Sequence, residues 1–393
     1  MLVSVSLVII IGLLLGSLAK KLNLPSLIGL LFAGILLGPF ALNILSDSFL
    51  ALSSDLRTIA LIVILTRAGL SLNIADLKKV GRPAILMCFI PALFEIIGTT
   101  LLAPIFLSLS ISEALLLGSV LAAVSPAVIV PRMLHLMKEG YGKEKSIPQI
   151  ILAGSSVDDV FVLVLFTAFL GINEGGSFTP IQLTSIPIAI ISGACGGLLT
   201  GYLLIQLFKK FPMRDTVKIL VILATSFLLM GFENAMESSF PFSGMLSVIG
   251  VSIIIFRKEK SLAQRLSIKF NKVWIIAEIF LFVLVGASVD LNYAISAGIS
   301  PLILLILVSL FRMFGVFVAL IRTSLTFKEK LFCMISYLPK ATVQAAIGAV
   351  PLTLGLASGE IILTVSVLSI LLTAPIGAWL IDRFYPYLLK NKN

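Results

Sequence analysis

The chain has 393 residues, of which 59% are hydrophobic and only 12% are charged, and its formal net charge is +10. Together with a mean hydropathy of +1.15, this composition excludes a soluble domain and indicates a polytopic membrane protein. The apolar runs are each about 20 residues long, which is the length of a membrane-spanning helix, and strand-like alternation is absent. The expected fold class is therefore all-α.

Thirteen apolar segments are predicted to span the membrane. They are residues 2–19, 24–42, 57–74, 83–108, 112–134, 147–172, 181–208, 216–232, 239–256, 271–289, 299–321, 330–355 and 361–381. The first segment has no basic start and no small-residue cleavage site before Lys20, so it is interpreted as a span and not as a removable signal. Only a short basic tail follows the last segment, so we expect no fused cytoplasmic domain.

Basic residues predict the orientation of the chain. Twenty-five of the 29 Lys and Arg residues fall in alternate loops or at the span ends that border them, from Lys20 and Lys21 to Lys390 and Lys392. The positive-inside rule places these loops in the cytoplasm, with the N-terminus outside and the C-terminus in the cytoplasm. The positive net charge is thus mostly a signal of topology and does not indicate a nucleic-acid partner.

Two adjacent carboxylates, Asp158 and Asp159, interrupt the apolar run 147–172. An acid near the middle of a spanning helix costs about 3 kcal/mol by insertion scales, so the pair is expected to line a polar cavity. Ser155 precedes Asp159 by four residues, which places its hydroxyl on the same helix face. Hard oxygen ligands of this kind suit a small monovalent cation or a proton. The alternative is an acid pair neutralised by buried basic residues that only hold helices together.

Apart from the 25 residues at the cytoplasmic side and Arg57, three basic residues remain, and they lie within predicted spans, where they need partners. Arg67 is near the end of its span and can extend its charge to the membrane surface, but Arg312 lies in the middle of its span. The possible partners of Arg312 are the intramembrane acids Glu95, Asp158, Asp159 and Glu278. Lys340 is expected to balance the carbonyl ends of interrupted helices. A direct role for Lys340 in handling the ion is the alternative.

The number of predicted spans fits an inverted repeat of six plus six helices around one linking helix, in which the fifth and twelfth spans are counterparts. Both counterparts contain prolines, with Ser125 and Pro126 in the fifth span and Pro339 in the twelfth. Proline leaves backbone polar groups without helical partners, which only a polar cavity can satisfy. Paired breaks therefore predict an ion site at the membrane midplane, although two ordinary proline kinks would give the same pattern.

Several motifs resemble the monovalent cation/proton antiporter superfamily. Residues 24–39, LPSLIGLLFAGILLGP, are similar to its opening signature, and residues 68–77, AGLSLNIADL, to its third-span motif. Residues 124–131, 140–148, 155–159 and 338–346 resemble the NHA-type Na⁺/H⁺ exchanger branch, in its double-aspartate subgroup. The resemblance spans nearly the whole chain and implies the Na⁺/H⁺ antiporter fold with two crossed broken helices.

The resemblance also implies roles for parts of the chain and for single residues. It implies a homodimer in which residues 1–80 and 216–292 form the dimerisation scaffold, 81–172 and 297–385 the ion-transporting core, and 181–208 the linking helix. Asp159 would bind Na⁺, Li⁺ or the proton, with Asp158 beside it, and Ser125 and Pro126 would form the break in the fifth span. Arg312 would pair with Glu95 and not with Asp158, while Glu278 has no role in the family pattern.

The expected function is secondary active antiport of Na⁺ or Li⁺ against H⁺ by alternating access at the plasma membrane. The ion and the proton would compete for Asp159, and neither enzymatic activity nor a cofactor is expected. One alternative is a sodium-coupled symporter of organic anions with the same architecture, because Lys340 could line a cationic substrate cavity. K⁺/H⁺ antiport is another, and the sequence leaves ion selectivity and stoichiometry open.

Overall fold

The computed structural model describes residues 1–22, 24–71, 81–174, 180–236, 240–296 and 298–390. Within these ranges all regular structure is helical. Nine helices of the described part are long and apolar enough to cross a membrane. The prediction of an all-α polytopic protein is confirmed, and the count of thirteen spans stays a prediction. Of the basic residues used to predict orientation, Lys78, Lys79 and Lys392 lie outside the described residues.

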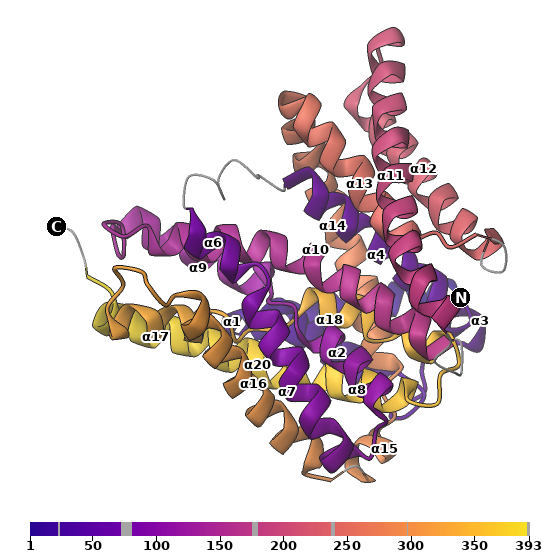
Figure 1. Ribbon diagram of the computed structural model, residues 1–393. Helices are drawn as coiled ribbons and strands as arrows, with labels where there is room; N and C mark the ends of the chain where they lie inside the picture. The colour runs from indigo at the N-terminus through magenta and orange to yellow at the C-terminus, as the bar shows by residue number, and fades with distance from the viewer. Residues whose placement is uncertain (23, 72–80, 175–179, 237–239, 297, 391–393) are drawn as a thin grey trace. The chain divides into compact units, whose positions relative to one another are not determined.

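The helices are α1 Leu2–Lys21, α2 Ser26–Leu37, α3 Asp47–Leu50, α4 Ser53–Ser71, α6 Arg82–Met87, α7 Ile90–Leu107, α8 Ile111–Leu121, α9 Pro126–Glu139, α10 Ile147–Glu174, α11 Pro180–Lys210, α12 Asp215–Met236, α13 Gly244–Lys258, α14 Lys260–Ala287, α15 Leu291–Ser296, α16 Ser300–Ala319, α17 Phe327–Ser336, α18 Thr342–Ile347, α19 Val350–Thr353 and α20 Gly359–Leu388 (Figure 1).

The chain divides into two compact units. Unit 1 comprises Met1–Ala51, Asn73–Val162 and Phe282–Asn393, and unit 2 comprises Leu52–Leu72 and Leu163–Leu281. Helices α10 and α14 each contribute one part to each unit. These units are defined by internal contacts, so they do not test the predicted division into scaffold and core.

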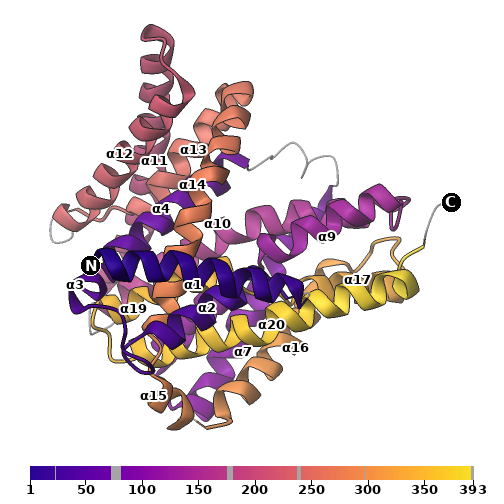
Figure 2. The ribbon, with the colours of Figure 1, turned by 180° about the vertical axis from the view of Figure 1, so that it is seen from behind.

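Two helix pairs organise unit 1. Helices α1 and α2 lie against each other (Figure 2), and α7 packs along α16. The close approach of α7 and α16 depends on small residues, because a side chain at Gly98 would clash with Phe311 and one at Gly315 with Phe94. This packing brings Glu95 on α7 and Arg312 on α16 to the same depth in the unit, where they form an ion pair.

The fifth and twelfth predicted spans are both broken, as the sequence predicts. In the fifth, α8 ends at Leu121 and α9 begins at Pro126. In the twelfth, α17 ends at Ser336 and α18 begins at Thr342. Pro126 occupies the first turn of α9, where its missing N–H leaves no helical bond unmade. The two breaks therefore place short non-helical segments in the interior of unit 1.

Unit 2 also contains a close helix pair, α11 and α13. Side chains added at Gly193 and Gly197 of α11 would clash with the Ser243 and Ser247 backbone next to and within α13. The Ser247 hydroxyl donates a hydrogen bond of 2.7 Å to the Gly193 carbonyl. Small residues and a serine hydroxyl at the contact are the usual means by which helices approach closely in a membrane.

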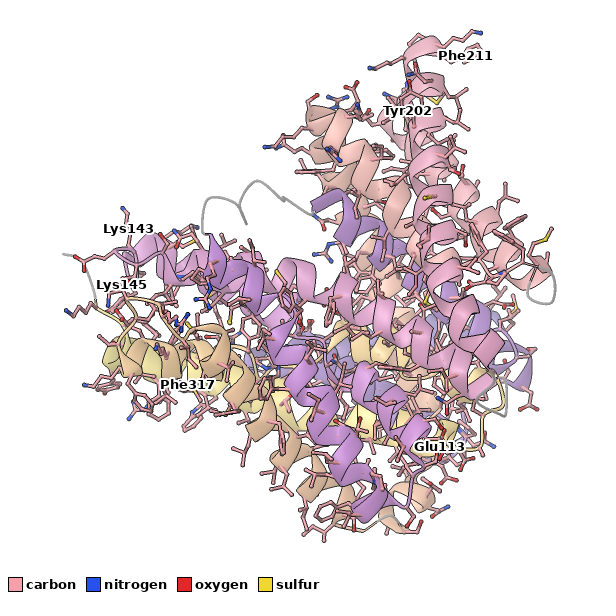
Figure 3. All side chains as sticks on the ribbon, in the orientation of Figure 1. Glu113, Lys143, Lys145, Tyr202, Phe211 and Phe317 are labelled. Atoms are coloured by element: carbon pink, nitrogen blue, oxygen red, sulfur yellow. The ribbon has the colours of Figure 1, made fainter. Side chains whose placement is uncertain are left out.

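Unit 1 carries basic side chains at one end and an acidic side chain at the other. Lys143 and Lys145, between α9 and α10, lie at one end, and Glu113, in the first turn of α8, lies at the other (Figure 3). The loop with the two lysines is anchored by a 2.7 Å ion pair from Lys145 to Glu329, which caps α17. Helix α9 is held to α20 at the same end by the two-oxygen contact of Arg132 with Asp382.

Candidate functional site

The two broken helices meet directly at their interruptions. The backbone N–H of Ser125, at the start of α9, donates a 2.8 Å hydrogen bond to the carbonyl oxygen of Pro339. This contact joins the break in α8–α9 to the break in α17–α18. The two crossed broken helices that the family resemblance implies are thus present.

Side chains satisfy the carbonyl groups that end α8. Lys340 Nζ donates to Leu121 O at 2.8 Å, and Arg312 Nη1 donates to Ala122 O. The Nε2 atom of Gln344 donates to Ala123 O at 2.7 Å and to Leu121 O at 3.2 Å. An unsatisfied carbonyl in a membrane interior costs roughly several kcal/mol. These contacts therefore make the break between α8 and α9 possible.

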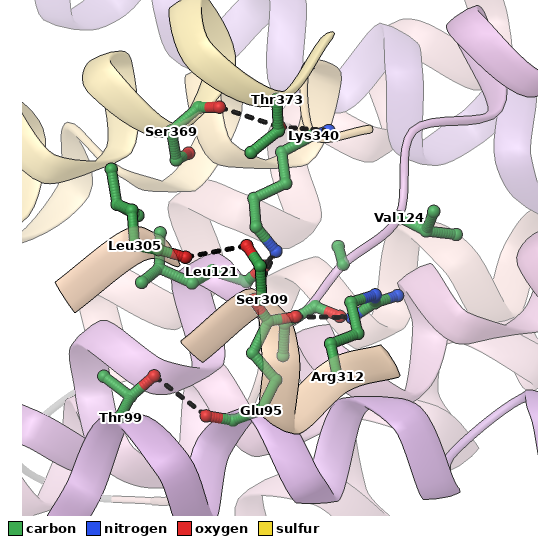
Figure 4. Close-up of polar contacts among 12 residues, drawn as sticks. Glu95, Thr99, Leu121, Val124, Leu305, Ser309, Arg312, Lys340, Ser369 and Thr373 are labelled. Atoms are coloured by element: carbon green, nitrogen blue, oxygen red, sulfur yellow. Dashed lines mark hydrogen bonds and ion pairs between the residues drawn. The ribbon is translucent and has the colours of Figure 1, made fainter. Parts of the chain in front are cut away.

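Glu95 accepts from two cations at this crossing. Arg312 Nη1 lies 2.7 Å from Glu95 Oε2, and Lys340 Nζ pairs with Glu95 Oε1. Figure 4 shows the Arg312 and Lys340 side chains converging on the Glu95 carboxylate. All three side chains are at most 1% exposed. Such a group is stable only when its charges and hydrogen-bonding atoms are matched.

Arg312 also links this cluster to the double aspartate. Its Nη2 atom lies 3.1 Å from Asp158 Oδ2, and its Nε donates to the Tyr337 carbonyl at 2.6 Å. The same Asp158 oxygen accepts the backbone N–H of Val124 at 2.8 Å. Asp158 is therefore fixed from two sides, by a side chain of α16 and by the backbone that follows α8.

Asp159 has a different environment from its neighbour. It is 9% exposed, and its Oδ1 atom is buried without a hydrogen-bond partner among the described residues. No described basic residue forms an ion pair with it, while Arg312, Lys340, Glu95 and Asp158 together carry two positive and two negative charges. With those four charges balanced, the ionised Asp159 adds one uncompensated negative charge to the interior of unit 1.

Several buried oxygen atoms at the crossing have unused hydrogen-bonding capacity. Those without a partner in the described part of the chain include Ser125 Oγ, Asp158 Oδ1, Asp159 Oδ1 and Tyr337 Oη. The Ser125 residue occupies the N-cap position of α9, yet its hydroxyl makes no capping bond. Ser155 is fully buried, and its hydroxyl donates to its own helix at Leu152 O, 3.2 Å away, which leaves its oxygen lone pairs available.

The structure supports the predicted geometry of the basic residues and adds to it. The predicted contact of Arg312 with Glu95 is present, but the expectation that Arg312 does not pair with Asp158 is wrong, because Arg312 contacts both acids. Lys340 contacts a helix-end carbonyl as predicted, and it also pairs with Glu95. The prediction of a single pair of one base and one acid is therefore incomplete, because the broken helices also bring Lys340 next to Glu95.

The remaining intramembrane charges, Arg67 and Glu278, both belong to unit 2. They interact electrostatically with each other, and the Arg67 guanidinium lies 5.8 Å from the centre of the Trp274 ring. A cation over an aromatic face is a favourable arrangement in a membrane interior. Arg67, for which the sequence predicted an extension to the membrane surface, thus has an aromatic and an acidic partner.

Sequence reasoning missed three contributors to the crossing. They are the Gln344 side chain, the Val124 backbone N–H and the Tyr337 backbone carbonyl. The position of Gln344 in the motif at residues 338–346 is the only sequence signal for it. The two backbone groups become visible only once the breaks are placed in space.

Comparison with known proteins shows what the chain as a whole is similar to. The family described as "Sodium/hydrogen exchanger, transmembrane" matches residues 5–383. Sodium/hydrogen exchanger 9B2 from Homo sapiens is 34% identical over 388 residues, covering 94% of this chain and 70% of that protein. Sodium/hydrogen exchanger 9B1 from Homo sapiens is 32% identical over 384 residues, covering 94% of this chain and 73% of that protein.

A solved structure confirms the predicted fold. The sodium proton antiporter MjNhaP1 from Methanocaldococcus jannaschii, determined at pH 8, superposes with a TM-score of 0.83. The alignment covers 98% of this chain and 97% of that chain at 23% sequence identity. This likeness establishes the architecture.

Proposed function

The chain belongs to the sodium/hydrogen exchanger family, and we propose that it exchanges Na⁺ or Li⁺ for H⁺ by alternating access at Asp159. One observation carries the assignment of this residue. Asp158 is held by Arg312 and Val124, whereas the buried Asp159 has no ion-pair partner in the described part of the chain. Asp159 is therefore the carboxylate that is available to a proton or a cation.

Exchange follows from competition for a single charge. A buried ionised carboxylate without a counter-charge is unfavourable, and binding either a proton or a sodium ion removes that penalty. The empty, ionised form carries a net negative charge in the membrane interior, so it crosses between the inward- and outward-facing states least easily. Only loaded carriers then change state readily, which couples the two movements.

The unpartnered oxygens supply the remaining ligands for the ion. Ser125 Oγ and Asp158 Oδ1 have no partner within the described residues, and Ser155 Oγ retains lone pairs. Together with Asp159, they form a set of hard oxygen ligands that suits Na⁺ or Li⁺. Pro126 contributes by starting α9 immediately after Ser125, which keeps this hydroxyl at the crossing.

The contacts of Lys340 weigh against the symport of an organic anion. That reading needs a cation free to bind an anionic substrate, but Lys340 Nζ is occupied by Glu95 and by the Leu121 carbonyl. Arg312 is occupied by Glu95 and Asp158. Discrimination among Na⁺, Li⁺ and K⁺ depends on the spacing of the ligands around the ion and is measured by transport.

The assembly and orientation are part of the same proposal. We propose a homodimer at the plasma membrane with the N-terminus outside, in which residues 1–80 and 216–292 form the scaffold and residues 81–172 and 297–385 move as the core. Residues 181–208 connect the two. The separation of Lys143 and Lys145 from Glu113 in unit 1 supports the orientation.

The Asp159→Asn variant tests the central assignment. The amide keeps the shape of the side chain but removes the charge for which the ion and the proton compete, so transport and Na⁺ binding should both be lost. The measurement is Na⁺-driven collapse of a pH gradient in proteoliposomes, without any organic solute.

Asp158→Asn should keep part of the activity with altered pH dependence. Near-normal exchange by Asp159→Asn would disprove the proposal, and a response to K⁺ equal to that with Na⁺ would favour K⁺/H⁺ antiport.

A further inference from the structure

Gln344 joins the two broken helices through all of its amide atoms. Its Oε1 accepts the backbone N–H of Ala341 at 2.9 Å, ahead of α18. Its Nε2 donates to Ala123 O at 2.7 Å and to Leu121 O at 3.2 Å, beyond and at the end of α8. Only this amide orientation matches donors with acceptors, since the reverse would place oxygen against two carbonyls. The side chain is 1% exposed, so water offers no substitute.

The carbonyl of Ala123 belongs to the same peptide group as the N–H of Val124. In a trans peptide, these two groups point in opposite directions from one rigid plane. Gln344 holds the oxygen of this plane, and Asp158 Oδ2 accepts its N–H at 2.8 Å. The Ala123–Val124 peptide is therefore fixed at both ends, by an amide on one side and by a carboxylate of the double aspartate on the other.

We infer that Gln344 is a positioning residue for the ion site, which keeps the Ala123–Val124 peptide turned so that its N–H binds Asp158. The inference rests on the proposed function, in that Asp158 and Asp159 are taken as the ion-binding carboxylates. Within the described part of the chain, Gln344 itself makes no hydrogen bond to either carboxylate. Its effect reaches Asp158 through the peptide plane, and it links the same plane to the start of α18.

The Ala123 carbonyl depends on Gln344 more than its neighbour does. Leu121 O receives a second donor from Lys340, whereas Gln344 is the only donor to Ala123 O within the described residues. A buried carbonyl without a partner is unfavourable, so loss of Gln344 favours rotation of the peptide plane toward another donor. That rotation withdraws the Val124 N–H from Asp158.

The consequence for the ion concerns the orientation of Asp158. Its Oδ2 atom is held by Val124 and by Arg312, which leaves Oδ1 available. With the Val124 bond lost, Arg312 alone fixes the carboxylate, and Oδ1 is no longer held where the ion needs it. The affinity for Na⁺ should fall while Asp159, the exchangeable charge, remains intact.

The test uses two substitutions in the full chain. Gln344→Met keeps nearly the same length and removes both polar ends. Gln344→Asn keeps the amide on a side chain one methylene shorter, which is too short to reach both breaks. For each, KM for Na⁺ and kcat are measured in proteoliposomes, and the rise in melting temperature on adding Na⁺ is measured in detergent. We expect KM to rise about tenfold with a smaller change in kcat, equivalent to about 1.4 kcal/mol.

The matched control is Ser366→Ala. Ser366 lies against the α18 segment, next to Gly348, but its hydroxyl bonds within its own helix to Ile362 at 2.6 Å. This control removes a buried polar group beside the same segment without touching the Ala123–Val124 peptide. It should leave KM for Na⁺ unchanged.

Each outcome decides between a positioning and a purely structural role. An unchanged KM and an unchanged Na⁺-induced stabilisation in the Gln344 variants would overturn the inference. Failure of both Gln344 variants to fold while Ser366→Ala folds would also overturn the inference, because Gln344 would then be needed for folding and not for positioning Asp158. Failure of the proposed function is recognised separately, since it would appear as exchange by Asp159→Asn whatever the Gln344 variants do.

Discussion

Glu95 is the residue on which the buried charges of unit 1 depend. It neutralises Arg312 at 2.7 Å and also pairs with Lys340, so its removal leaves two cations with fewer partners. Arg312 retains Asp158 in that case, but among the described residues Lys340 Nζ retains only the Leu121 carbonyl. The three charged side chains cannot be considered as one isolated pair.

A double-mutant cycle on melting temperature tests this shared arrangement. Glu95→Ala and Arg312→Ala should each destabilise by about 3–5 kcal/mol, because each leaves a buried charge unsatisfied. The double variant should be less destabilised than the sum of the two. Arg312 should also couple to Asp158 in a second cycle with Asp158→Asn. Strict additivity of Glu95→Ala and Arg312→Ala would contradict the arrangement.

The helix breaks can be predicted from sequence, because proline acts on its own turn and its immediate neighbours. Pro126 and Pro339 both lie at or beside the interruptions that the structure shows. The contacts of Gln344 could not be predicted, since its acceptor carbonyls lie 221 and 223 residues away in the chain. Neither helical period nor residue type indicates a partner so distant.

The break between α17 and α18 also packs closely against α10. A side chain at Gly154 of α10 would clash with the Tyr337 hydroxyl, which is buried and has no partner among the described residues. Gly154→Ala should therefore destabilise by about 1–3 kcal/mol through overpacking. Tyr337→Phe alone should change stability by about 1 kcal/mol or less, because no hydrogen bond is lost.

The combination of these two substitutions is the informative measurement. Tyr337→Phe removes the atom with which the new methyl group collides, so the double variant should recover part of the melting temperature lost in Gly154→Ala. Recovery should be incomplete, because Met87 also lies within the space that the methyl group takes. A double variant less stable than Gly154→Ala would show that the hydroxyl contributes a bond.

The start of α17 carries a pH-dependent contact outside the spanning segments. Burial acts to raise the pKa of Glu329, but hydrogen bonds from Lys145 and from Thr326 outweigh it and hold that pKa below its ordinary value of 4.5. A carboxyl with a lowered pKa in the folded state stabilises the fold above its unfolded pKa. That contribution is lost as the pH falls through the lowered value.

Glu329→Gln should accordingly lower the melting temperature at neutral pH, by the equivalent of about 1 kcal/mol. The difference from the unsubstituted chain should shrink as the pH falls below 4.5. Thermal unfolding of both proteins in detergent across this range is the measurement. A difference that stays constant with pH would show that the Lys145 contact does not carry the effect.

At the scale of the whole molecule, helix length alone does not count the spans. Nine described helices are long enough to cross a membrane, and shorter apolar helices include Ser26–Leu37, Ile111–Leu121 and Thr342–Thr353. Two of these three belong to the broken fifth and twelfth spans. The sequence pattern treats each broken span as one apolar segment, whereas the structure divides it into two short helices. The composition predicts the class of fold, but these interruptions prevent helix length from giving the number of spans.

The balance of buried charge predicts the electrical behaviour of transport. Glu95 and Asp158 are offset by Arg312 and Lys340, so the proposed function leaves Asp159 as the single exchangeable charge. One Na⁺ should then replace one proton, and exchange should generate no current. Transport current and rate are to be measured with and without an imposed membrane potential. A current that reverses with the ion gradients would require a second titrating group, with Asp158 as the first candidate.

The distance along the chain between Glu95 and Arg312 also constrains how the protein is made. The two residues are 217 positions apart, so at 5–20 residues per second a ribosome needs roughly 10–40 s to deliver the arginine after the glutamate. During that interval α7 must reside in the membrane without either of its eventual cations, because Lys340 is made later still. The ion pair of Glu95 with Arg312 therefore forms only once α16 has been made, and the pair with Lys340 forms later still. The last third of the nascent chain is thus the stage at which this site is assembled.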